Sequence, residues 1–354
     1  MNVQTAKNWS GSGLLKDAGR HHLATAEGML LSRIEADRLT LSGPDGAIAA
    51  AADISFEDGK LLVENVFIAS DRLDEPNLLA ALVDGALRMH PSAERAFLPA
   101  AQRLWAVSAL ATEMAPGELN LAVVHRSTLR QLPLLWRRQA SHAIYPYLAT
   151  AIGPQDRLPP LRPPRPSGLM YERWVPELEL TLSLRPIDRR RDLDLFHKWM
   201  NDGRVAFFWE LAKSREDLDR YLAEQESDPH IFGVIASFDE EPTGYFEFYW
   251  AKEDRLGPHY EPLDYDRGWH GLIGNPRHLG RPKTLAIFRS VTHYLFLDEP
   301  RTLRVVGEPR AAHQKMLSYC ADVAYDKVKE FDFPHKRAML VCCERERFFR
   351  EVPL

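Results

Sequence analysis

The sequence predicts an α/β (α+β) protein of two lobes, and three observations lead to this prediction. The second half of the 354-residue chain alternates strand-like and helix-like segments in the order β-α-α-β-β-β-α-β-α-β-β. The first half carries a less distinct version of the later part of that order. Between the halves, residues 153–168 contain six prolines, which excludes a helix or a central strand there. We therefore expect domains over residues 1–152 and 177–354, joined by a stiff, extended linker over 153–176.

In the first lobe, three strand-like runs are separated by turns that contain glycine. A helix, a short strand, a second helix and a last strand follow. In chain order these elements are Met29–Ile34, Ala47–Ile54, Lys60–Ile68, Asn77–Met89, Arg95–Leu98, Ala101–Thr112 and Asn120–His125. The order suggests a structural repeat of the second lobe, although no repeat is visible in the residues themselves.

The second lobe opens with an alternating strand at Leu180–Ile187 and a helix at Arg191–Asn201 with apolar residues at helical spacing. A second helix, Ser214–Gln225, begins with a capping box. Another helix, Pro282–Leu297, has proline in its first turn. The remaining elements are strands at Ile231–Phe238, Thr243–Ala251, Gly268–Ile273 and Thr302–Val306, a helix at Arg310–Cys320, and a hairpin of Asp326–Phe333 with Lys336–Cys342.

Composition excludes several classes of protein. The chain has 45 basic and 50 acidic residues, whereas nucleic-acid-binding domains usually carry a basic excess. Its first residues lack the apolar core of a signal peptide, and its apolar runs are far shorter than the ~20 residues of a membrane span. Its three cysteines show no CxxC spacing. We expect a soluble protein of the reducing cytoplasm that binds neither nucleic acid nor membrane.

The loop Asn275–Lys283 lies between a predicted strand and a long helix. A helix N-terminus offers backbone N–H groups and a favourable dipole to a phosphate group. Arg277, Gly280, Arg281 and Lys283 would add cations and backbone donors for a pyrophosphate. The ordinary alternative is a solvated connection between a strand and a helix.

His270 lies in the strand just ahead of this loop. An imidazole titrates near neutral pH and can act as a general base, although a lone histidine is more often half-buried and structural. Glu308 follows the fifth strand, which would lie beside the fourth. Its carboxylate would orient His270 or take the proton itself. Alternatively, it is an exposed residue at a helix N-terminus.

The run Tyr245–Asp254 combines aromatic and charged side chains on a strand. It would line a cleft for a cationic, aliphatic substrate, or its aromatics would simply fill the core. Aromatics at 197–201 and 207–210 likewise fit either a lid or the core. The substrate-binding candidates are Trp209, Glu247, Tyr249, Trp250, Lys252, Asp254 and Trp269. The sequence contains no HExxH, GxSxG, GxxxxGK[ST] or GxGxxG motif, and we predict no metal site.

Five segments of the second lobe carry a family resemblance. They are HKWMNDGRVAFFWE (197–210), GYFEFYWAKED (244–254), DRGWHGLIG (266–274), YLFLDEPRTLRVVGEPR (294–310) and KEFDFPHKRAMLV (329–341). The lobe resembles the Gcn5-related N-acetyltransferase (GNAT) superfamily and, within it, the acyltransferases of hydroxamate siderophore biosynthesis of the aerobactin and mycobactin types. The resemblance implies a mixed, mostly antiparallel sheet flanked by helices. It also implies a degenerate GNAT-like first lobe without a working cofactor site.

The activity that the resemblance implies is transfer of an acyl group from acetyl-coenzyme A, or another acyl-coenzyme A, to the hydroxylamine nitrogen of an N-hydroxylated amine. The family's catalytic histidine in the RGxH strand falls on His270, and its carboxylate on Glu308. The pyrophosphate loop falls on 277–282, where Pro282 removes one N–H donor. Ala312 and His313 stand where the family often has Asp-Asn. The coenzyme-binding candidates are Leu272, Ile273, Gly274, Arg277, Gly280, Arg281, Lys283 and Arg310.

Two other functions remain open at this point. One is an acetyltransferase of a non-hydroxylated polyamine or lysine amine, and the other is a non-catalytic acyl-coenzyme A-binding scaffold subunit. The sequence also leaves open whether the acceptor is hydroxylysine, hydroxyornithine, hydroxyputrescine or hydroxycadaverine. The acyl group and the oligomeric state, a homodimer included, are open as well.

Overall fold

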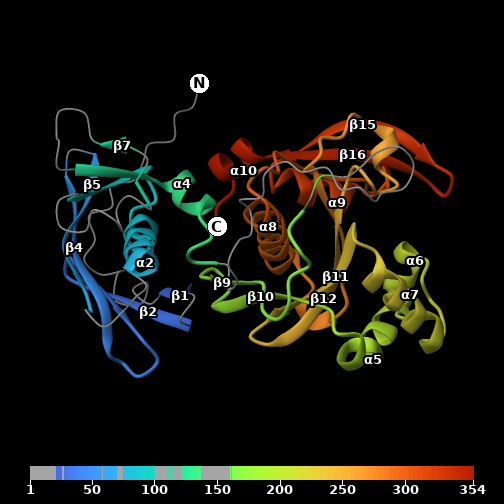
Figure 1. Ribbon diagram of the computed structural model, residues 1–354, viewed down its shortest axis with the longest axis horizontal. Helices are drawn as coiled ribbons and strands as arrows, with labels where there is room; N and C mark the ends of the chain where they lie inside the picture. The colour runs from blue at the N-terminus through green and yellow to red at the C-terminus, as the bar shows by residue number, and fades with distance from the viewer. Residues whose placement is uncertain are drawn as a thin grey trace. The chain divides into compact units, whose positions relative to one another are not determined.

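The computed structural model describes residues 21–25, 28–57, 59–69, 75–99, 110–111, 113–114, 121–136, 160 and 162–354. These residues form two eight-stranded sheets (Figure 1). The chain divides into two compact units, residues 1–129 and 130–354, each built around one sheet. Among the described residues, no helix is long and apolar enough to cross a membrane.

The sheet of the first unit has the order β1-β2-β3-β4-β5-β6-β8-β7. Its strands are β1 (His21–Thr25), β2 (Gly28–Glu35), β3 (Arg38–Ser42), β4 (Ile48–Glu57), β5 (Lys60–Ile68), β6 (Arg95–Pro99), β7 (Glu113–Met114) and β8 (Leu121–His125). Helix α2 (Glu75–Met89) packs its buried apolar residues against this sheet, and α4 (Arg126–Gln131) follows β8. The predicted strands and the helix at 77–89 are confirmed, and β1, β3, β7 and α4 are additional. The predicted helix Ala101–Thr112 lies almost entirely outside the described residues.

The sheet of the second unit has the order β15-β16-β14-β13-β12-β11-β10-β9. Its strands are β9 (Tyr171–Val175), β10 (Leu180–Pro186), β11 (Ile231–Phe238), β12 (Glu241–Trp250), β13 (Arg267–Ile273), β14 (Arg304–Gly307), β15 (Tyr325–Phe333) and β16 (Lys336–Glu344). Its helices are α5 (Arg189–Met200), α6 (Gly203–Trp209), α7 (Arg215–Ser227), α8 (Arg281–Asp298), α9 (Gln314–Ala321) and α10 (Arg345–Glu351), with short 3₁₀ turns η1 (Gly257–His259) and η2 (Pro276–His278).

The two sheets repeat the same topology, strand for strand. In each, antiparallel strands lead to one parallel pair, β5 with β6 and β13 with β14, and a helix connects the members of that pair. The GNAT fold expected from the resemblance, with two such lobes in tandem, is therefore present. The units differ between their second and third strands. A turn at 36–37 joins β2 to β3, whereas α5, α6 and α7 lie between β10 and β11.

Three elements of the second unit were not predicted. Strand β9 lies within the range for which the sequence predicts a linker, and it pairs with β10. Helix α6 forms where we expected a loop, because Asp202 caps its N-terminus and Glu210 ends it in the left-handed conformation. Helix α10 follows the last hairpin. The helix predicted to start at Arg310 starts only at Gln314, because the chain turns through 311–313 first.

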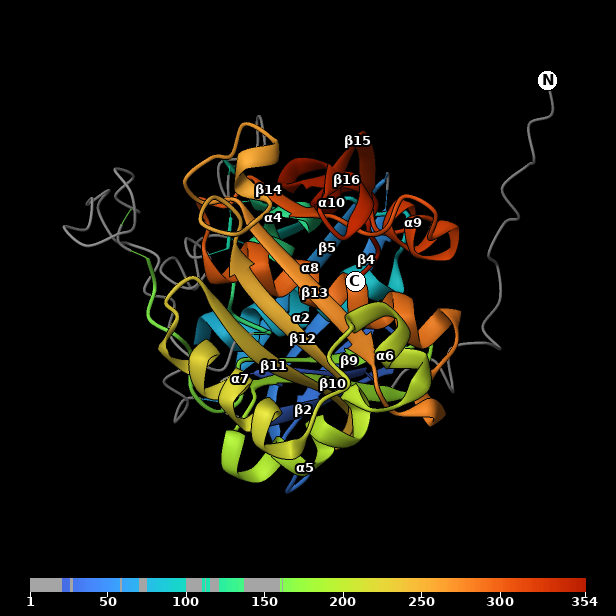
Figure 2. The same cartoon turned by 90° about the vertical axis from the view of Figure 1, so that its right-hand side faces the viewer.

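The sheet of the second unit is covered on both faces. Figure 2 shows α8 behind the sheet and α5, α6 and α7 in front of it, and in Figure 1 the same helices lie to the left and to the right of its strands. Side chains of β12 alternate between the two faces. Tyr245 packs on Phe196 of α5, with ring centroids 4.7 Å apart. Phe248 stacks on Tyr294 of α8 at 5.6 Å. Odd-numbered residues of β12 therefore face α5 and α7, and even-numbered residues face α8.

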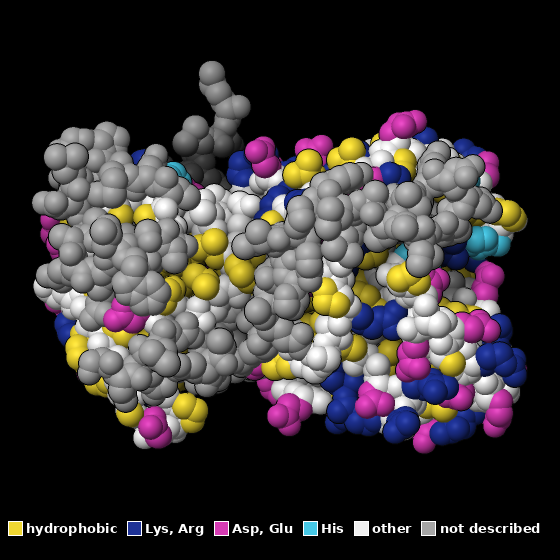
Figure 3. All heavy atoms as spheres, viewed as in Figure 1, with side chains coloured by type: hydrophobic (Ala, Val, Ile, Leu, Met, Phe, Trp, Pro, Cys, Tyr) yellow, Lys and Arg dark blue, Asp and Glu magenta, His cyan; other side chains and the backbone are white. Residues whose placement is uncertain are grey.

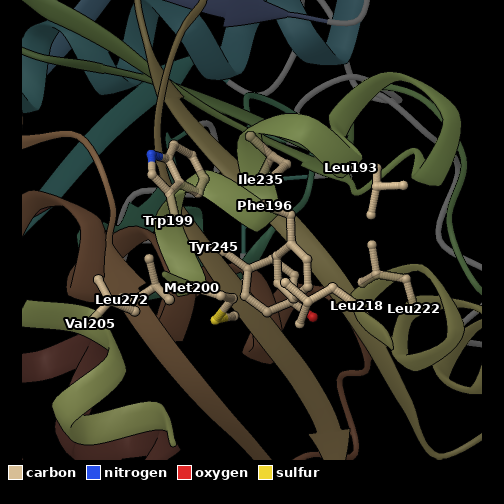
Figure 4. Packing of buried hydrophobic residues seen from close by; sticks show 10 residues of the cluster. All are labelled: Leu193, Phe196, Trp199, Met200, Val205, Leu218, Leu222, Ile235, Tyr245 and Leu272. Atoms are coloured by element: carbon tan, nitrogen blue, oxygen red, sulfur yellow. The ribbon is translucent and has the colours of Figure 1, made fainter. Parts of the chain in front are cut away.

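A cluster of ten buried residues fills the space between the sheet and the front helices (Figure 4). Phe196, Trp199 and Met200 of α5 meet Tyr245 of β12 and Leu272 of β13 in this cluster. Trp199 lies so close to Gly274 that a Cβ at position 274 would overlap its ring. The cluster thus fixes the end of β13 against α5.

The solvent faces of α5 and α7 are charged. Figure 3 shows Lys and Arg side chains interspersed with Asp and Glu where these helices lie at the lower right. Ion pairs join the two helices at Arg215–Asp194 (2.7 Å) and Arg189–Asp219 (3.4 Å). Exposed pairs of this kind contribute about 0–1 kcal/mol each, so the apolar cluster beneath them dominates the packing.

Candidate active site

His270 lies in the middle of β13 between two carboxylates from neighbouring strands. Its Nδ1 is 3.1 Å from Oε2 of Glu247, which stands directly opposite in the antiparallel register of β12 and β13. Its Nε2 is 2.9 Å from Oε1 of Glu308, which follows β14. The imidazole is one-fifth exposed, whereas both carboxylates are buried. The structure therefore brings together His270 and Glu308, the pair that the sequence placed on adjacent strands.

The carboxylate of Glu247 is held by three further donors. Tyr245 donates to its Oε1 at 3.1 Å, and Gln225 donates to the same oxygen at 3.0 Å. Tyr221 also donates to this oxygen. Tyr221 and Gln225 lie four residues apart on α7, so they share the face of the helix that meets the sheet. With these partners and His270, Glu247 is fully engaged inside the protein.

The carboxylate of Glu308 lies among cations. Arg255 donates to its Oε1 at 3.0 Å, and Tyr249 donates to its Oε2 at 3.0 Å. Lys336 donates to the backbone oxygen of Glu308 at 2.7 Å and approaches Oε1 at 3.5 Å. Arg255 is also 3.4 Å from Nε2 of His270. These residues come from the segment after β12, from β12 itself and from the start of β16.

The two carboxylates decide the charge of His270. Burial alone would lower the pKa of the imidazole, but the charge of Glu308 and the hydrogen bonds to Glu247 and Glu308 outweigh burial and raise that pKa to about 10. Burial would raise the pKa of Glu308, but His270, Lys336 and Arg255 hold it well below its usual value. At neutral pH the site therefore holds an imidazolium between two carboxylates, with both ring nitrogens donating.

Among the predicted substrate residues, those on odd-numbered positions of β12 lie on the His270 face. The ring of Tyr249 is 4.7 Å from that of His270. Trp209 packs on Tyr245 at 5.7 Å on the same face. Trp269, next to His270 in the strand, points the opposite way and donates to the hydroxyl of Tyr325 at 2.9 Å.

Three other candidates lie away from His270. Trp250 faces α8 and is stacked between Arg162 at 4.4 Å and Arg267 at 4.0 Å. Lys252 pairs with Asp264. Asp254 accepts from the backbone of Leu256 and lies 3.6 Å from His230. The structure thus divides the run 245–254 between the two faces of the sheet and the turn beyond it.

The loop ahead of α8 has the form of a helix N-terminus open to solvent. Gly280, the N-cap residue, has φ of 126°, a conformation that strongly favours glycine, and no side chain caps the helix. Arg277, Arg281 and Lys283 gather around this end. Arg277 pairs with Glu241, Arg281 pairs with Asp322, and Lys283 lies 3.1 Å from His278. The predicted loop residues therefore do lie together, each with an internal partner.

The parallel strands β13 and β14 separate just before His270. They pair at Arg267 with Val305 and at Gly268 with Val306. Beyond Gly268, β13 pairs with β12 alone within the described part of the sheet. Leu272 points into the apolar cluster. One backbone edge of β13, from Trp269 to Ile273, therefore faces the opening between the strands and can pair with an extended ligand that carries amide groups.

Helix α6 approaches the segment after β14. Arg310 pairs with Glu210 at 2.6 Å, and the ring of Phe208 stacks on His313 with centroids 4.8 Å apart. Phe207 is 72% exposed. Phe207 and Phe208 of α6 therefore lie outside the apolar core, next to the place where β13 and β14 separate. Within the described residues, no group of three or more His, Cys, Asp or Glu side chains is arranged to hold a metal ion.

Four residues of the site escaped the sequence analysis: Arg255, Lys336, Tyr221 and Gln225. The last two could have been recognised as polar residues four apart on the apolar face of an amphipathic helix. Arg255 and Lys336 reach Glu308 from positions 53 and 28 residues away, so no local pattern reveals them.

Comparison with known proteins finds matches over the part of the chain that carries these residues. Residues 188–333, which contain His270, Glu247 and Glu308, match the family model of the acetyltransferase (GNAT) domain. The N(6)-hydroxylysine O-acetyltransferase of Escherichia coli is 41% identical over 238 residues, which cover 67% of this chain and 75% of that protein.

Two further matches cover a smaller share of this chain. The N(5)-hydroxyornithine:cis-anhydromevalonyl coenzyme A-N(5)-transacylase of Beauveria bassiana is 42% identical over 217 residues, 58% of this chain and 48% of that protein. This chain thus spans about half the length of that fungal relative. Among solved structures, an uncharacterized protein of Bacillus halodurans matches with 28% identity and a TM-score of 0.49, over 51% of this chain and 92% of that one.

Proposed function

Because the chain belongs to the acetyltransferase (GNAT) family and is similar to the N(6)-hydroxylysine O-acetyltransferase of Escherichia coli, we propose that it acylates the hydroxylamine nitrogen of an N-hydroxylated amine. The acyl donor is an acyl-coenzyme A, and the product is a hydroxamate for siderophore biosynthesis. One observation carries the proposal: His270 is held between Glu247 and Glu308 where β13 and β14 separate. Three free cysteines agree with a reducing cytoplasm as the site of the reaction.

The residues at the opening between the strands fit acyl-coenzyme A, which supplies the activated thioester. The uncapped N-terminus of α8, with Gly280 at its start, suits a pyrophosphate. Arg277, Arg281 and Lys283 would turn from their internal partners toward it. The backbone edge of β13 from Trp269 to Ile273 suits the amides of the pantetheine arm. Arg310 follows β14, the other strand of this opening, and pairs with Glu210.

In the proposed reaction a C–N bond forms, the thioester C–S bond breaks, and one proton moves from nitrogen to sulfur. A hydroxylamine is largely unprotonated at neutral pH, so its nitrogen attacks directly. His270 holds a proton that it can give to the departing sulfur, and the resulting neutral ring can take the proton that nitrogen loses. Acid–base help of this kind contributes about 10²–10⁴-fold in rate. Holding the two substrates side by side contributes further.

The charges around Glu308 favour an acceptor that carries a carboxylate. Arg255 is half exposed beside His270, and it donates to Glu308 through Nη2. Lys336 lies on the other side of Glu308. With His270 protonated, three cations face the two carboxylates Glu247 and Glu308. We therefore propose an N-hydroxylated amino acid, such as N-hydroxylysine or N-hydroxyornithine, rather than an N-hydroxylated diamine.

The experiment is a thiol-release assay with matched acceptors. N-hydroxylysine and N-hydroxycadaverine differ only in the carboxylate, and lysine and cadaverine are the non-hydroxylated controls. We expect turnover of N-hydroxylysine, slower turnover of N-hydroxycadaverine, and almost none of either parent amine. Arg255→Gln should narrow the difference between the two hydroxylamines.

Two results would contradict the proposal. Equal turnover of lysine or cadaverine would favour an ordinary amine acetyltransferase. Coenzyme binding by calorimetry without turnover of any acceptor would favour a non-catalytic subunit. His270→Ala should lower kcat by roughly 10²–10⁴-fold. Wild-type turnover in that variant would remove His270 from the reaction.

We also propose that catalysis belongs to the second unit and that the first is a degenerate copy. The helix α7, which supplies Tyr221 and Gln225 to Glu247, has no counterpart between β2 and β3, which the turn at 36–37 connects. The domain limits 1–152, 153–176 and 177–354 can be tested by expressing residues 153–354 alone. Retained thiol release in that fragment would support this division.

A further inference from the structure

We propose that Arg165, in the proline-rich segment ahead of the second sheet, is a positioning residue for His270 and acts through helix α7. Only the activity measurement of this inference rests on the proposed function. The contacts from which it is argued all lie within the second unit. The relevant segment is Arg162–Gly168, which we call the strap. Its sequence, RPPRPSG, was expected to be no more than a stiff connection.

The guanidinium of Arg165 lies at the C-terminus of α7. It donates to the backbone oxygens of Gln225 at 3.0 Å and Glu226 at 3.1 Å, and also to those of Asp228 and Ile231, each at 2.8 Å. The last turn of α7, all of it described, contains no basic side chain of its own. A cation there adds hydrogen bonds to the last carbonyl groups of the helix and interacts favourably with the negative end of the helix dipole. Arg165 thus adds a cation from the strap to the C-terminus of α7, where the backbone N–H of Asp228 also donates to Gln225.

Helix α7 in turn holds the carboxylate that holds His270. Gln225, whose backbone oxygen Arg165 binds, donates its side-chain amide to Oε1 of Glu247 at 3.0 Å. Tyr221, one turn earlier, donates to the same oxygen. The other oxygen of Glu247 is 3.1 Å from Nδ1 of His270. A short chain of direct contacts therefore runs from Arg165 through Gln225 and Glu247 to the imidazole.

The strap is fastened at a second point, so Arg165 is presented from a fixed position. Arg162 pairs with Glu253 at 2.5 Å, donates to the backbone oxygen of Asp264 at 2.7 Å and stacks on Trp250 at 4.4 Å. Prolines at 163, 164 and 166 restrict the backbone on both sides of Arg165. A restricted segment loses less conformational entropy when it docks than a flexible one would. The strap therefore holds α7 at little entropic cost.

The contacts of His270 show what the loss of Arg165 would change. The ring faces Glu247 and Tyr249 of β12, Glu308 after β14, and Arg255 after β12, while Lys336 acts on it through Glu308. Among these neighbours of His270, Glu247 accepts hydrogen bonds from two side chains of α7, Tyr221 and Gln225. If the last turn of α7 loosens, Glu247 moves from the imidazole while the Glu308 side keeps its partners. The imidazolium then loses one of its two acceptors and releases its proton more easily.

The test is a titration of His270 by nuclear magnetic resonance in the full-length protein labelled with ¹⁵N-histidine. The signal of His270 is identified by its loss in His270→Gln. Arg165→Ala should raise the acid dissociation constant of His270 about tenfold, which is a fall of about one pH unit in its midpoint. Arg220→Ala is the matched control, because Arg220 is a surface arginine on the same helix that pairs with Asp217. The titration midpoint of His270 in Arg220→Ala should equal that in the wild type.

Gln225→Ala tests the route of the effect. It should shift the midpoint in the same direction as Arg165→Ala, and the double variant should shift it by less than the sum, since both changes act on one chain of contacts. An unchanged His270 midpoint in Arg165→Ala, with a lower melting temperature, would make Arg165 merely structural and overturn the proposal. Additive shifts in the double variant would overturn the route through Gln225. If Arg165→Ala fails to fold, Arg165→Lys takes its place, with a smaller shift expected and an unchanged midpoint again overturning the proposal.

The titration needs no substrate, so it separates this inference from the proposed function. If the protein acylated no hydroxylamine, the shift in the His270 midpoint would still be measured. Where activity is present, Arg165→Ala should lower kcat with little change in KM for acyl-coenzyme A, because the strap does not contact the loop ahead of α8 in the described contacts. A rise in KM alone would contradict a positioning role.

Discussion

The ring of Tyr249 lies against Gly268, its direct partner in the antiparallel register of β12 and β13. A Cβ at position 268 would overlap the ring. Because glycine leaves this space open, the hydroxyl of Tyr249 reaches Glu308 at 3.0 Å. The glycine two residues before His270 thus allows one of the contacts that keep Glu308 in place. A buried carboxylate depends on such donors for its ionised state.

Gly268→Ala should therefore lower kcat by more than its effect on the free energy of unfolding explains. Forcing a methyl group into this contact should cost about 1–3 kcal/mol in the free energy of unfolding. Displacing Tyr249 should lower kcat further than that instability explains. Gly203→Ala is the control, because a Cβ there meets open space. Urea unfolding and thiol release are measured on both variants, and equal kcat in the two would argue against a role for the Tyr249 contact.

The stability of the protein should depend on pH through His270. The pKa of this histidine is raised from 6.5 to about 10 in the folded protein, so its stabilising effect is complete below pH 6.5 and is lost as pH rises through about 10. The pKa values of Glu308 and Glu247 are lowered, so their contribution is present above about pH 4.5 and is lost as the pH falls. We expect wild type to exceed His270→Gln in free energy of unfolding at neutral pH. The gap should close above about pH 10 in denaturant titrations. A gap independent of pH would mean that the ring is not protonated.

Most elements of the second sheet could be predicted because each shows its own periodicity. The helix at 215–227 has a capping serine, and the strands at 231–238 and 241–250 are apolar runs around a turn. Strand β9 was hidden because it is short and follows a proline-rich segment, and its pairing with β10 is a tertiary contact. Helix α6 was hidden because it is short and two of its aromatics, Phe207 and Phe208, are exposed. Its contacts with the apolar cluster, through Val205 and Trp209, are too few within seven residues to show a helical period.

Only the part of the site that follows from the order of the strands could be predicted. His270 and Glu308 follow from placing β13 beside β14. Glu247 was expected to face a cationic substrate, and in the structure it faces Tyr221, Tyr245, Gln225 and His270. That difference depends on the register of β12 against β13, which no local pattern sets. The orientation of Trp269 away from His270, by contrast, follows from strand alternation alone.

Gly280→Ala should weaken binding of acyl-coenzyme A. Alanine at a φ of 126° is strained by about 1–3 kcal/mol, and relief of that strain would move the N–H groups at the start of α8. Gly46→Ala carries similar strain, at a φ of 78° in the first unit, without touching this loop. We expect both variants to lose stability, and Gly280→Ala in addition to raise KM for acyl-coenzyme A. An equal KM in the two would remove the start of α8 from the coenzyme site.

His293 should make the protein sensitive to acid. Its Nε2 is 2.6 Å from the backbone oxygen of Arg130 and must donate, so Nδ1 accepts from Tyr171 at 3.0 Å and the ring is neutral. Burial lowers its pKa from 6.5 to about 3. The stability that it contributes is thus complete above pH 6.5 and is lost as pH falls toward 3. His293→Gln should cost about 1–3 kcal/mol at neutral pH but flatten the decline of stability in acid. His197→Gln, on α5, is the control, and equal acid slopes in the two variants would contradict the assignment.

The stability of the second unit should be sensitive to the loss of one partner from a buried ion pair. Arg267, at the start of β13, donates to Asp298, at the end of α8, at 2.9 Å. Both side chains are buried, and Tyr294 donates to Asp298 at 3.0 Å. Removing one partner leaves an uncompensated charge in the core, so Asp298→Ala should lower the free energy of unfolding by about 3–5 kcal/mol. Replacing both partners by apolar residues, as in Arg267→Met with Asp298→Leu, should cost clearly less. Denaturant unfolding of the single and double variants decides this. A double variant less stable than Asp298→Ala would show that the pair itself, rather than the avoidance of a lone charge, holds β13 to α8.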